Sequence, residues 1–156
     1  MLQRHTRMRP VSDKRRARLA AHGIKHIAST LVTLGRSDTG PSRRVRRAVA
    51  RRSGGICEWP RCWGAATDMH HRLNRKNGGR HGDMAELINQ PEWLIHCCRM
   101  HHMVATSPVG QTRQVVIAMG WLLLEGQDAA VELVLTRHDP FPVRLLRSGQ
   151  LEVPPL

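Results

Sequence analysis

All four cysteines of the chain lie between residues 57 and 98, and histidine pairs lie among and just after them. The clustered residues are Cys57, Cys62, His70, His71, Cys97, Cys98, His101 and His102. Thiolates and imidazoles are the ligands that zinc prefers in small domains. A chain of 156 residues has room for one small domain and a tail, and such a domain often needs a metal or disulfides for stability. We therefore expect this segment to determine the fold.

The same cysteines are better explained as metal ligands than as disulfides. The first 20 residues carry charge but lack the apolar segment of a secretory signal, so we expect a cytoplasmic protein with reduced thiols. The longest apolar run, Val115 to Leu124, is about half of the roughly 20 residues that a membrane-spanning helix needs. We expect no membrane insertion.

Basic residues are concentrated at the beginning of the chain. The first 52 residues hold 15 of the 25 Lys and Arg but 2 of the 12 Asp and Glu, so the whole excess charge of +13 lies there. Such a density of cations favours salt-sensitive binding to nucleic-acid phosphates. An anionic membrane is the alternative target, but the segment lacks a wide apolar face with Trp or Phe.

Three regions are expected along the chain. Residues 1–40 form a basic arm and linker, disordered to about residue 20 or helical between residues 12 and 34. Residues 41–110 form the core, beginning with a helix from Ser42 to about Arg52 that Gly54 and Gly55 end. Residues 111–156 pack on this core: a helix from 111 running into a strand by 124, a short strand at 131–135, and a hairpin of 143–146 with 151–153.

Two groups of basic residues are candidates for phosphate contacts. The first group lies on the expected helix: Arg43, Arg44, Arg46, Arg47 and Arg51. The second group follows the double histidine: Arg72, Arg75, Lys76 and Arg80. The alternative for the second group is an ordinary solvated loop.

The spacing Cys57-x4-Cys62 predicts a knuckle that supplies two zinc ligands, and a second pair must come from the segment between Cys97 and His101. The intervening His70-His71 pair follows a short predicted strand, 65–69. Successive residues of a strand point to opposite faces, so one imidazole could bind a metal while the other transfers a proton. The alternative is a pair of solvent-exposed loop histidines.

The order of these residues resembles the HNH endonucleases, in particular the zinc-knuckle type common in actinobacterial phages. The resemblance rests on Gly55-x-Cys57-Glu58-x3-Cys62, Asp68-x-His70-His71-Arg72, Gly78-Gly79, Trp93-Leu94 and Cys97-x3-His101. It extends from about residue 43 to the end of the chain, where Pro108 and Gly120-Trp121-Leu122 also fit.

The resemblance implies a small α+β fold built on a ββα-metal element, in which a β-hairpin carries the first histidines and a helix carries the last. It implies a structural Zn²⁺ and a catalytic Mg²⁺, Mn²⁺ or other divalent ion. By motif position His71 is the general base, His70 is a ligand of the catalytic ion, and Asp68 orients His70. The catalytic ion would stabilise charge on the scissile phosphate and the leaving 3′ oxygen.

Two positions depart from the family pattern. In one register Cys97 is a zinc ligand, Met100 replaces the fourth cysteine and His101 is catalytic. In the other, Cys98 and His101 bind zinc and His102 is catalytic, which coordination chemistry favours because a thioether is a poor zinc ligand.

The second departure is the central Asn of the motif, whose place is taken by Glu92 or Trp93. Asn89 lies a few residues earlier, and a local rearrangement of the loop could bring it into the site.

The expected function is metal-dependent hydrolysis of DNA phosphodiester bonds. The alternative is a non-catalytic, zinc-binding accessory protein that binds nucleic acid in phage packaging or recombination, with other phage proteins as partners. A third possibility is a nuclease directed at RNA.

Overall fold

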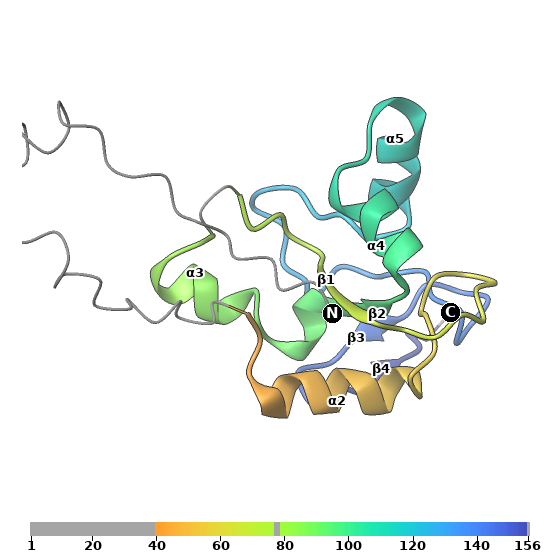
Figure 1. The fold of residues 1–156 in the computed structure, drawn as a ribbon, viewed down its shortest axis with the longest axis horizontal. Coiled ribbons are helices and arrows are strands. Elements are labelled where there is room, and N and C mark those ends of the chain that lie inside the picture. Colours follow the sequence, from red (N-terminus) through yellow and green to blue (C-terminus); the bar gives the residue numbers. More distant parts are fainter. Residues whose placement is uncertain (1–39, 77–78, 156) are drawn as a thin grey trace, which may run out of the picture. The chain divides into compact units, whose positions relative to one another are not determined.

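Two antiparallel strands and the helix that follows the second strand form the centre of the part of the chain that the structure describes (Figure 1). The computed structural model describes residues 40–76 and 79–155. The predicted helices or disorder of residues 1–39 lie outside the described residues. Within the described part the fold is a small α+β arrangement of four α-helices, one 3-10 helix and two small antiparallel sheets. The residues from 39 onwards, which include both the expected core and the expected C-terminal region, belong to one compact unit.

Helix α2 (Arg43–Ser53) forms where the sequence predicts it. The Ser42 hydroxyl accepts a hydrogen bond from the Val45 N–H, and Gly54 ends the helix in the left-handed conformation at φ 62°. Val49 is fully buried while the arginines of the helix point mostly outward. The helix therefore packs on the core through the face that carries Val49 and presents a basic surface on its other side.

Strands β1 (Asp68–His71) and β2 (Leu94–Cys97) pair antiparallel, with Asp68 opposite Cys97 and His71 opposite Leu94. The predicted strand at 65–69 begins later than expected, because Ala65 bridges Ile56 and the Ala66 N–H bonds to Gly55 O. The alternation of a strand puts His70 and His71 on opposite faces of the hairpin.

Two short helices connect these strands: α3 (Gly82–Leu87) and the 3-10 helix η1 (Pro91–Trp93). Helix α4 (Arg99–Thr106) follows β2 directly and packs on β1. The order strand, strand, helix therefore brings the residues around positions 70 and 100 together.

The C-terminal segment supplies much of the core. Helix α5 (Gly110–Ala118) forms where a helix running into a strand by 124 was expected, and the strand is reduced to a single bridge between Leu73 and Leu123. The helix ends where Gly120 takes φ 72° and its α-carbon lies against the Leu133 backbone. A Cβ on residue 120 would come within 2.0 Å of Leu133 O. Fully buried Trp121 and Val116 then pack with the hairpin residue Ile95.

The remaining C-terminal predictions differ in outcome. The expected strand at 131–135 is reduced to a single bridge between Val134 and Val143. The terminal hairpin is confirmed as β3 (Arg144–Leu145) paired with β4 (Leu151–Glu152).

Arg72 is the largest correction to the sequence analysis. Its side chain is fully buried, so it is not the phosphate contact that its position after the double histidine suggests. The guanidinium group instead donates hydrogen bonds to five backbone carbonyls, those of Gly120, Glu92, Ala129, Glu132 and Leu133. Burial lowers the pKa of Arg72 to about 9, which leaves it charged at neutral pH. Arg72 thereby ties the C-terminal segment to the hairpin.

Replacing Arg72 is expected to destabilise the protein strongly. In Arg72→Met the carbonyls stay buried without their donors, so we expect the free energy of unfolding to fall by roughly 3–5 kcal/mol. Exposed Arg113 on α5 provides the control. Arg113→Met should change the free energy of unfolding by less than about 0.5 kcal/mol. Urea denaturation measures both values. Equal stability of the two variants would contradict this role.

Candidate metal centre and adjoining histidines

The first two cysteines lie in a tight turn between α2 and β1. The Cys57 N–H bonds to Gly64 O at 2.8 Å, and the Cys62 N–H bonds to Trp59 O at 3.0 Å. These bonds fold the chain back on itself, so that both thiols face the start of α4. The predicted knuckle is present.

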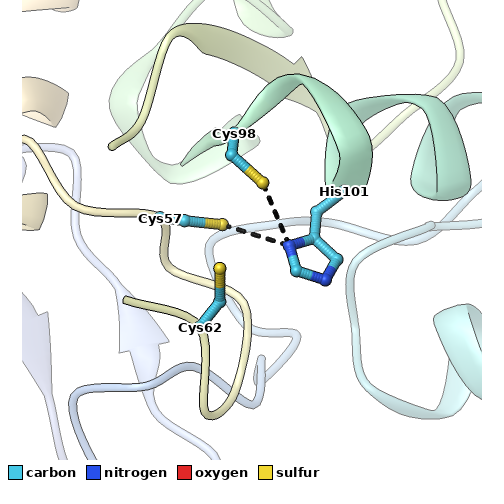
Figure 2. Close-up of side chains that lie close together, drawn as sticks. All are labelled: Cys57, Cys62, Cys98 and His101. Atoms are coloured by element: carbon cyan, nitrogen blue, oxygen red, sulfur yellow. Dashed lines mark hydrogen bonds between the residues drawn. The ribbon is translucent and has the colours of Figure 1, made fainter. Parts of the chain in front are cut away.

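Four side chains converge at this point: Cys57, Cys62, Cys98 and His101 (Figure 2). Their ligand atoms all lie within 4.8 Å of one another. His101 Nδ1 is 3.5 Å from Cys57 Sγ and 3.2 Å from Cys98 Sγ. Three thiols and one imidazole at this separation match the donor set of a closed, four-coordinate zinc site.

The position of Cys98 decides between the two registers considered above. Cys98 caps the N-terminus of α4 and His101 lies in its first turn, so both reach the knuckle. Cys97 is still part of β2, where it is buried in the core with its thiol 3.8 Å from Asp68 O. The register with Cys97 and Met100 as ligands is therefore wrong; Met100 is largely exposed.

The ligands differ in their tendency to lose a proton. Burial raises the pKa of the Cys57 thiol to about 12. Burial also opposes ionisation of Cys98, but backbone N–H groups at the start of α4 lower the pKa of its thiol overall. Burial lowers the pKa of His101, so its imidazole is neutral at neutral pH. Binding of zinc would displace the remaining thiol protons.

Two tryptophans hold the imidazole of the cluster in place. The indole of Trp59 stacks on the ring of His101, with centroids 4.5 Å apart and planes 7° from parallel. Trp121 meets Trp59 edge to face at 4.8 Å. The sequence analysis missed Trp59, although its position between the first two cysteines was a signal.

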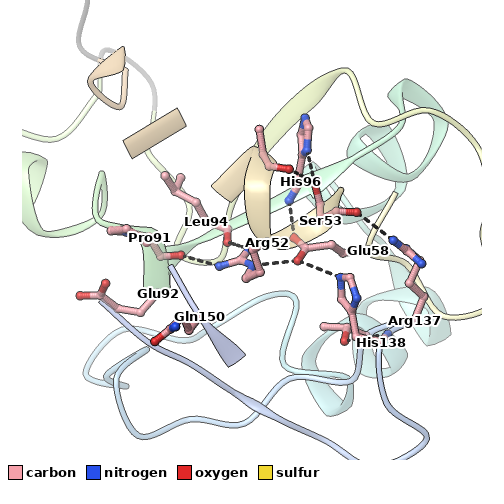
Figure 3. A network of polar contacts seen from close by, with 12 residues as sticks. Arg52, Ser53, Glu58, Pro91, Glu92, Leu94, His96, Arg137, His138 and Gln150 are labelled. Atoms are coloured by element: carbon pink, nitrogen blue, oxygen red, sulfur yellow. Dashed lines mark hydrogen bonds and ion pairs between the residues drawn. The ribbon is translucent and has the colours of Figure 1, made fainter. Parts of the chain in front are cut away.

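A buried ion pair includes Glu58, the residue that follows the first cysteine of the knuckle (Figure 3). Arg52 Nε and Nη2 donate to the two carboxylate oxygens of Glu58, each at 2.8 Å, and both side chains are 1% exposed. Burial opposes ionisation of Glu58, yet Arg52 lowers the pKa of this carboxyl to about 2. The His96 N–H donates to the same carboxylate at 2.7 Å. The pair therefore links α2, the knuckle and β2.

A second group of polar residues lies between β1 and α4. The rings of His70 and His102 are 5.8 Å apart and nearly perpendicular, and His102 Nδ1 is 3.9 Å from Asp68 Oδ1. His70 is buried, and its Nε2 donates a hydrogen bond to Trp121 O at 2.9 Å. Burial lowers the pKa of His70 to about 4, so the ring is neutral, with Nδ1 carrying the lone pair.

His71 lies on the opposite face of β1 and contacts Asn89 rather than His70. The two side chains meet with His71 Nε2 2.9 Å from Asn89 Oδ1. Since the Asn89 amide nitrogen donates to Ala85 O, its oxygen must be the acceptor, which assigns the proton to His71 Nε2. Nδ1 of His71 is then the basic nitrogen, and burial lowers its pKa so that it is unprotonated at neutral pH.

Asn89 thus reaches His71 although it precedes the family's expected position. The place of that Asn is occupied by Glu92 and Trp93, which are both buried. The Trp93 carbonyl accepts a hydrogen bond from the Arg72 N–H. The loop of α3 and η1 brings the amide in instead.

The second group of predicted phosphate contacts is mostly engaged within the protein. Lys76 and Arg80 both pair with Glu125, at 3.1 and 2.7 Å, and the Arg80 side chain is 9% exposed. Arg75 is half-buried and close enough to His71 to lower the pKa of that imidazole, after the larger effect of burial. Buried Arg72 has a corresponding but minor effect on the pKa of His70.

Comparisons with protein-family models, with curated proteins and with solved structures gave no match to the chain. Among residues 40–76 and 79–155, no helix is both long and apolar enough to cross a membrane. The site's own geometry therefore carries the functional argument.

Zinc content separates the two adjacent cysteines. We expect one zinc per chain in the purified protein, loss of most of it in Cys98→Ser, and retention in Cys97→Ala, because only the Cys98 thiol faces the other ligands. His101→Cys should keep the metal as a four-thiolate site. Elemental analysis after gel filtration measures each variant. Equal zinc loss in Cys97→Ala and Cys98→Ser would refute the ligand set.

Proposed function

We propose that the protein is an HNH-type endonuclease that hydrolyses DNA phosphodiester bonds with His71 as general base. The observation that carries the proposal is the state of His71: a neutral imidazole held through Nε2 by Asn89, with Nδ1 left as a proton acceptor. A general base needs this combination of fixed orientation and a pKa that leaves it unprotonated at neutral pH.

The residues around His71 support the same chemistry. His70 and His102 come from the strand and the helix that the family uses for its catalytic ion, and Asp68 lies beside His102. His70 could offer Nδ1 to a divalent ion, because its Nε2 is committed to Trp121 O, and such a backbone bond commonly orients metal-binding histidines. The ion would stabilise negative charge on the phosphate and on the leaving oxygen. Asp68 and His102 would complete its protein ligands.

In this mechanism His71 accepts the proton of the attacking water at Nδ1. Asn89 keeps the imidazole from rotating and maintains the tautomer that leaves Nδ1 basic. The charge of Arg75 contributes to the lowered pKa of His71. Arg75 would face the scissile phosphate and offset the negative charge of that phosphate. The cysteine cluster acts indirectly, since His101 of the cluster and His102 are neighbours on α4.

The competing function is a zinc module that binds nucleic acid without cleaving it. Asp68, His70 and His102 do not converge as closely as the cysteine cluster, which is the one such group of ligand atoms found among the described residues. This alternative predicts binding with no cleavage under any divalent ion.

A plasmid-cleavage assay with Mg²⁺ or Mn²⁺ tests the proposal. Wild-type protein should nick or cut the DNA, and His71→Ala should lower the rate by roughly 10²- to 10⁴-fold, the usual contribution of a general base. The control is His81→Ala, because His81 is exposed and makes no capping bond to α3. Asn89→Ala should lower the rate less than His71→Ala. Cleavage by His71→Ala at the wild-type rate would exclude His71 as the base.

A further inference from the structure

The exposed side of α2 forms one wall of a groove whose other wall is the turn of the terminal hairpin. One hollow of about 830 Å³ runs along the helix and is bounded by Arg147, Ser148, Gln90 and Pro91. A neighbouring hollow of about 740 Å³ shares Ala48, Arg51 and Ser148 with it and continues to Leu151. The two hollows therefore form one continuous groove.

Most of the cations that line the groove have no anionic partner among the described residues. Arg52, which pairs with Glu58, lines the smaller hollow, and four other arginines of the helix line the larger one: Arg43, Arg44, Arg47 and Arg51. Within the described part of the chain the guanidinium groups of these four make no hydrogen bond or ion pair, and none of the described residues that line either hollow is acidic. Arg147 faces them from the hairpin; one of its nitrogens is 3.5 Å from Glu92, and its side chain is 66% exposed.

A close contact between the backbone of the β3–β4 turn and helix α2 fixes the width of the groove. Gly149, in the turn between β3 and β4, is buried with φ 84°. A Cβ at this position would lie 3.0 Å from the Cβ of Ala48. The hairpin can approach α2 this closely because residue 149 is glycine, which also tolerates the left-handed conformation. The two walls are thus held by packing.

The groove is connected to the histidine site through the chain itself. Gln90 and Pro91 line it, and the preceding residue, Asn89, holds His71. Arg52 fixes this connection by donating to Pro91 O at 3.1 Å. The groove therefore begins one residue along the chain from the Asn89–His71 contact.

We infer that this groove binds the phosphodiester backbone of duplex DNA on one side of the cleavage site. The inference rests on the proposed function for the choice of ligand and adds the hairpin residue Arg147 to its contacts. Guanidinium groups match phosphate oxygens with two hydrogen bonds each, and backbone contacts of this kind position DNA without reading its sequence.

The salt dependence of DNA binding tests this surface directly. The slope of log K against log salt concentration is negative, and each lost phosphate contact lowers its magnitude by about 1. For the full-length chain with a labelled duplex of arbitrary sequence, Arg47→Gln combined with Arg51→Gln should lower the magnitude of the slope by about 2. Arg147→Gln alone should lower it by about 1. Fluorescence anisotropy without added divalent ions measures binding without cleavage.

The matched control removes the same charge elsewhere. Arg61 and Arg113 are exposed and line neither hollow, so Arg61→Gln with Arg113→Gln should leave the slope unchanged. Zinc content and thermal unfolding show that all variants are folded. Equal slopes for the groove double variant and the wild type, or an equal fall in the control, would overturn the assignment.

The outcome is independent of the catalytic proposal. His71→Ala should bind with the wild-type slope even where it fails to cleave, so failure of the nuclease assay leaves the binding result interpretable. The same titration with single-stranded RNA identifies the nucleic acid: a loss of slope seen with RNA and absent with duplex DNA overturns the choice of DNA.

Discussion

The buried pair of Arg52 and Glu58 is the contact on which most of the described structure depends. Removing two charges from water is costly, and the pair is tolerable because its hydrogen bonds are satisfied by Pro91 O, Leu94 O and the His96 N–H. Through them one interaction fixes the end of α2, the knuckle and the strand β2. Loss of either partner would leave an uncompensated charge, at a cost of about 3–5 kcal/mol. The cysteine cluster and the arginine groove therefore both depend on this ion pair.

Local signals in the sequence predicted the elements that local chemistry determines. Ser42 and Gly54 mark the two ends of α2 because each satisfies backbone groups within its own turn. The terminal hairpin was predictable for the same reason, and Cys57 and Cys62 face one another across a turn that their spacing dictates. The HNH-type activity suggested by the double histidine stays a proposal.

The errors arose where a distant part of the chain decides the environment. Arg72 was predicted to contact phosphate because it follows the double histidine. Carbonyls from residues 120 to 133 surround it instead, and no local sequence pattern indicates that contact. Cys97 and Cys98 could not be separated by spacing, since the outcome depends on where β2 ends. Asn89 reaches His71 through a loop whose path the motif does not specify.

The first turn of α4 carries members of both groups, Cys98 and His101 for the cluster and His102 for the histidines beside Asp68. Stripping the zinc with a chelator would therefore also release His102 from its position. Loss of activity in a chelator would then fail to identify which ion had been removed, and restoration by Mg²⁺ alone would require that zinc had stayed in place. For the proposed nuclease, the shared turn would make the order in which metals are added as important as their identity.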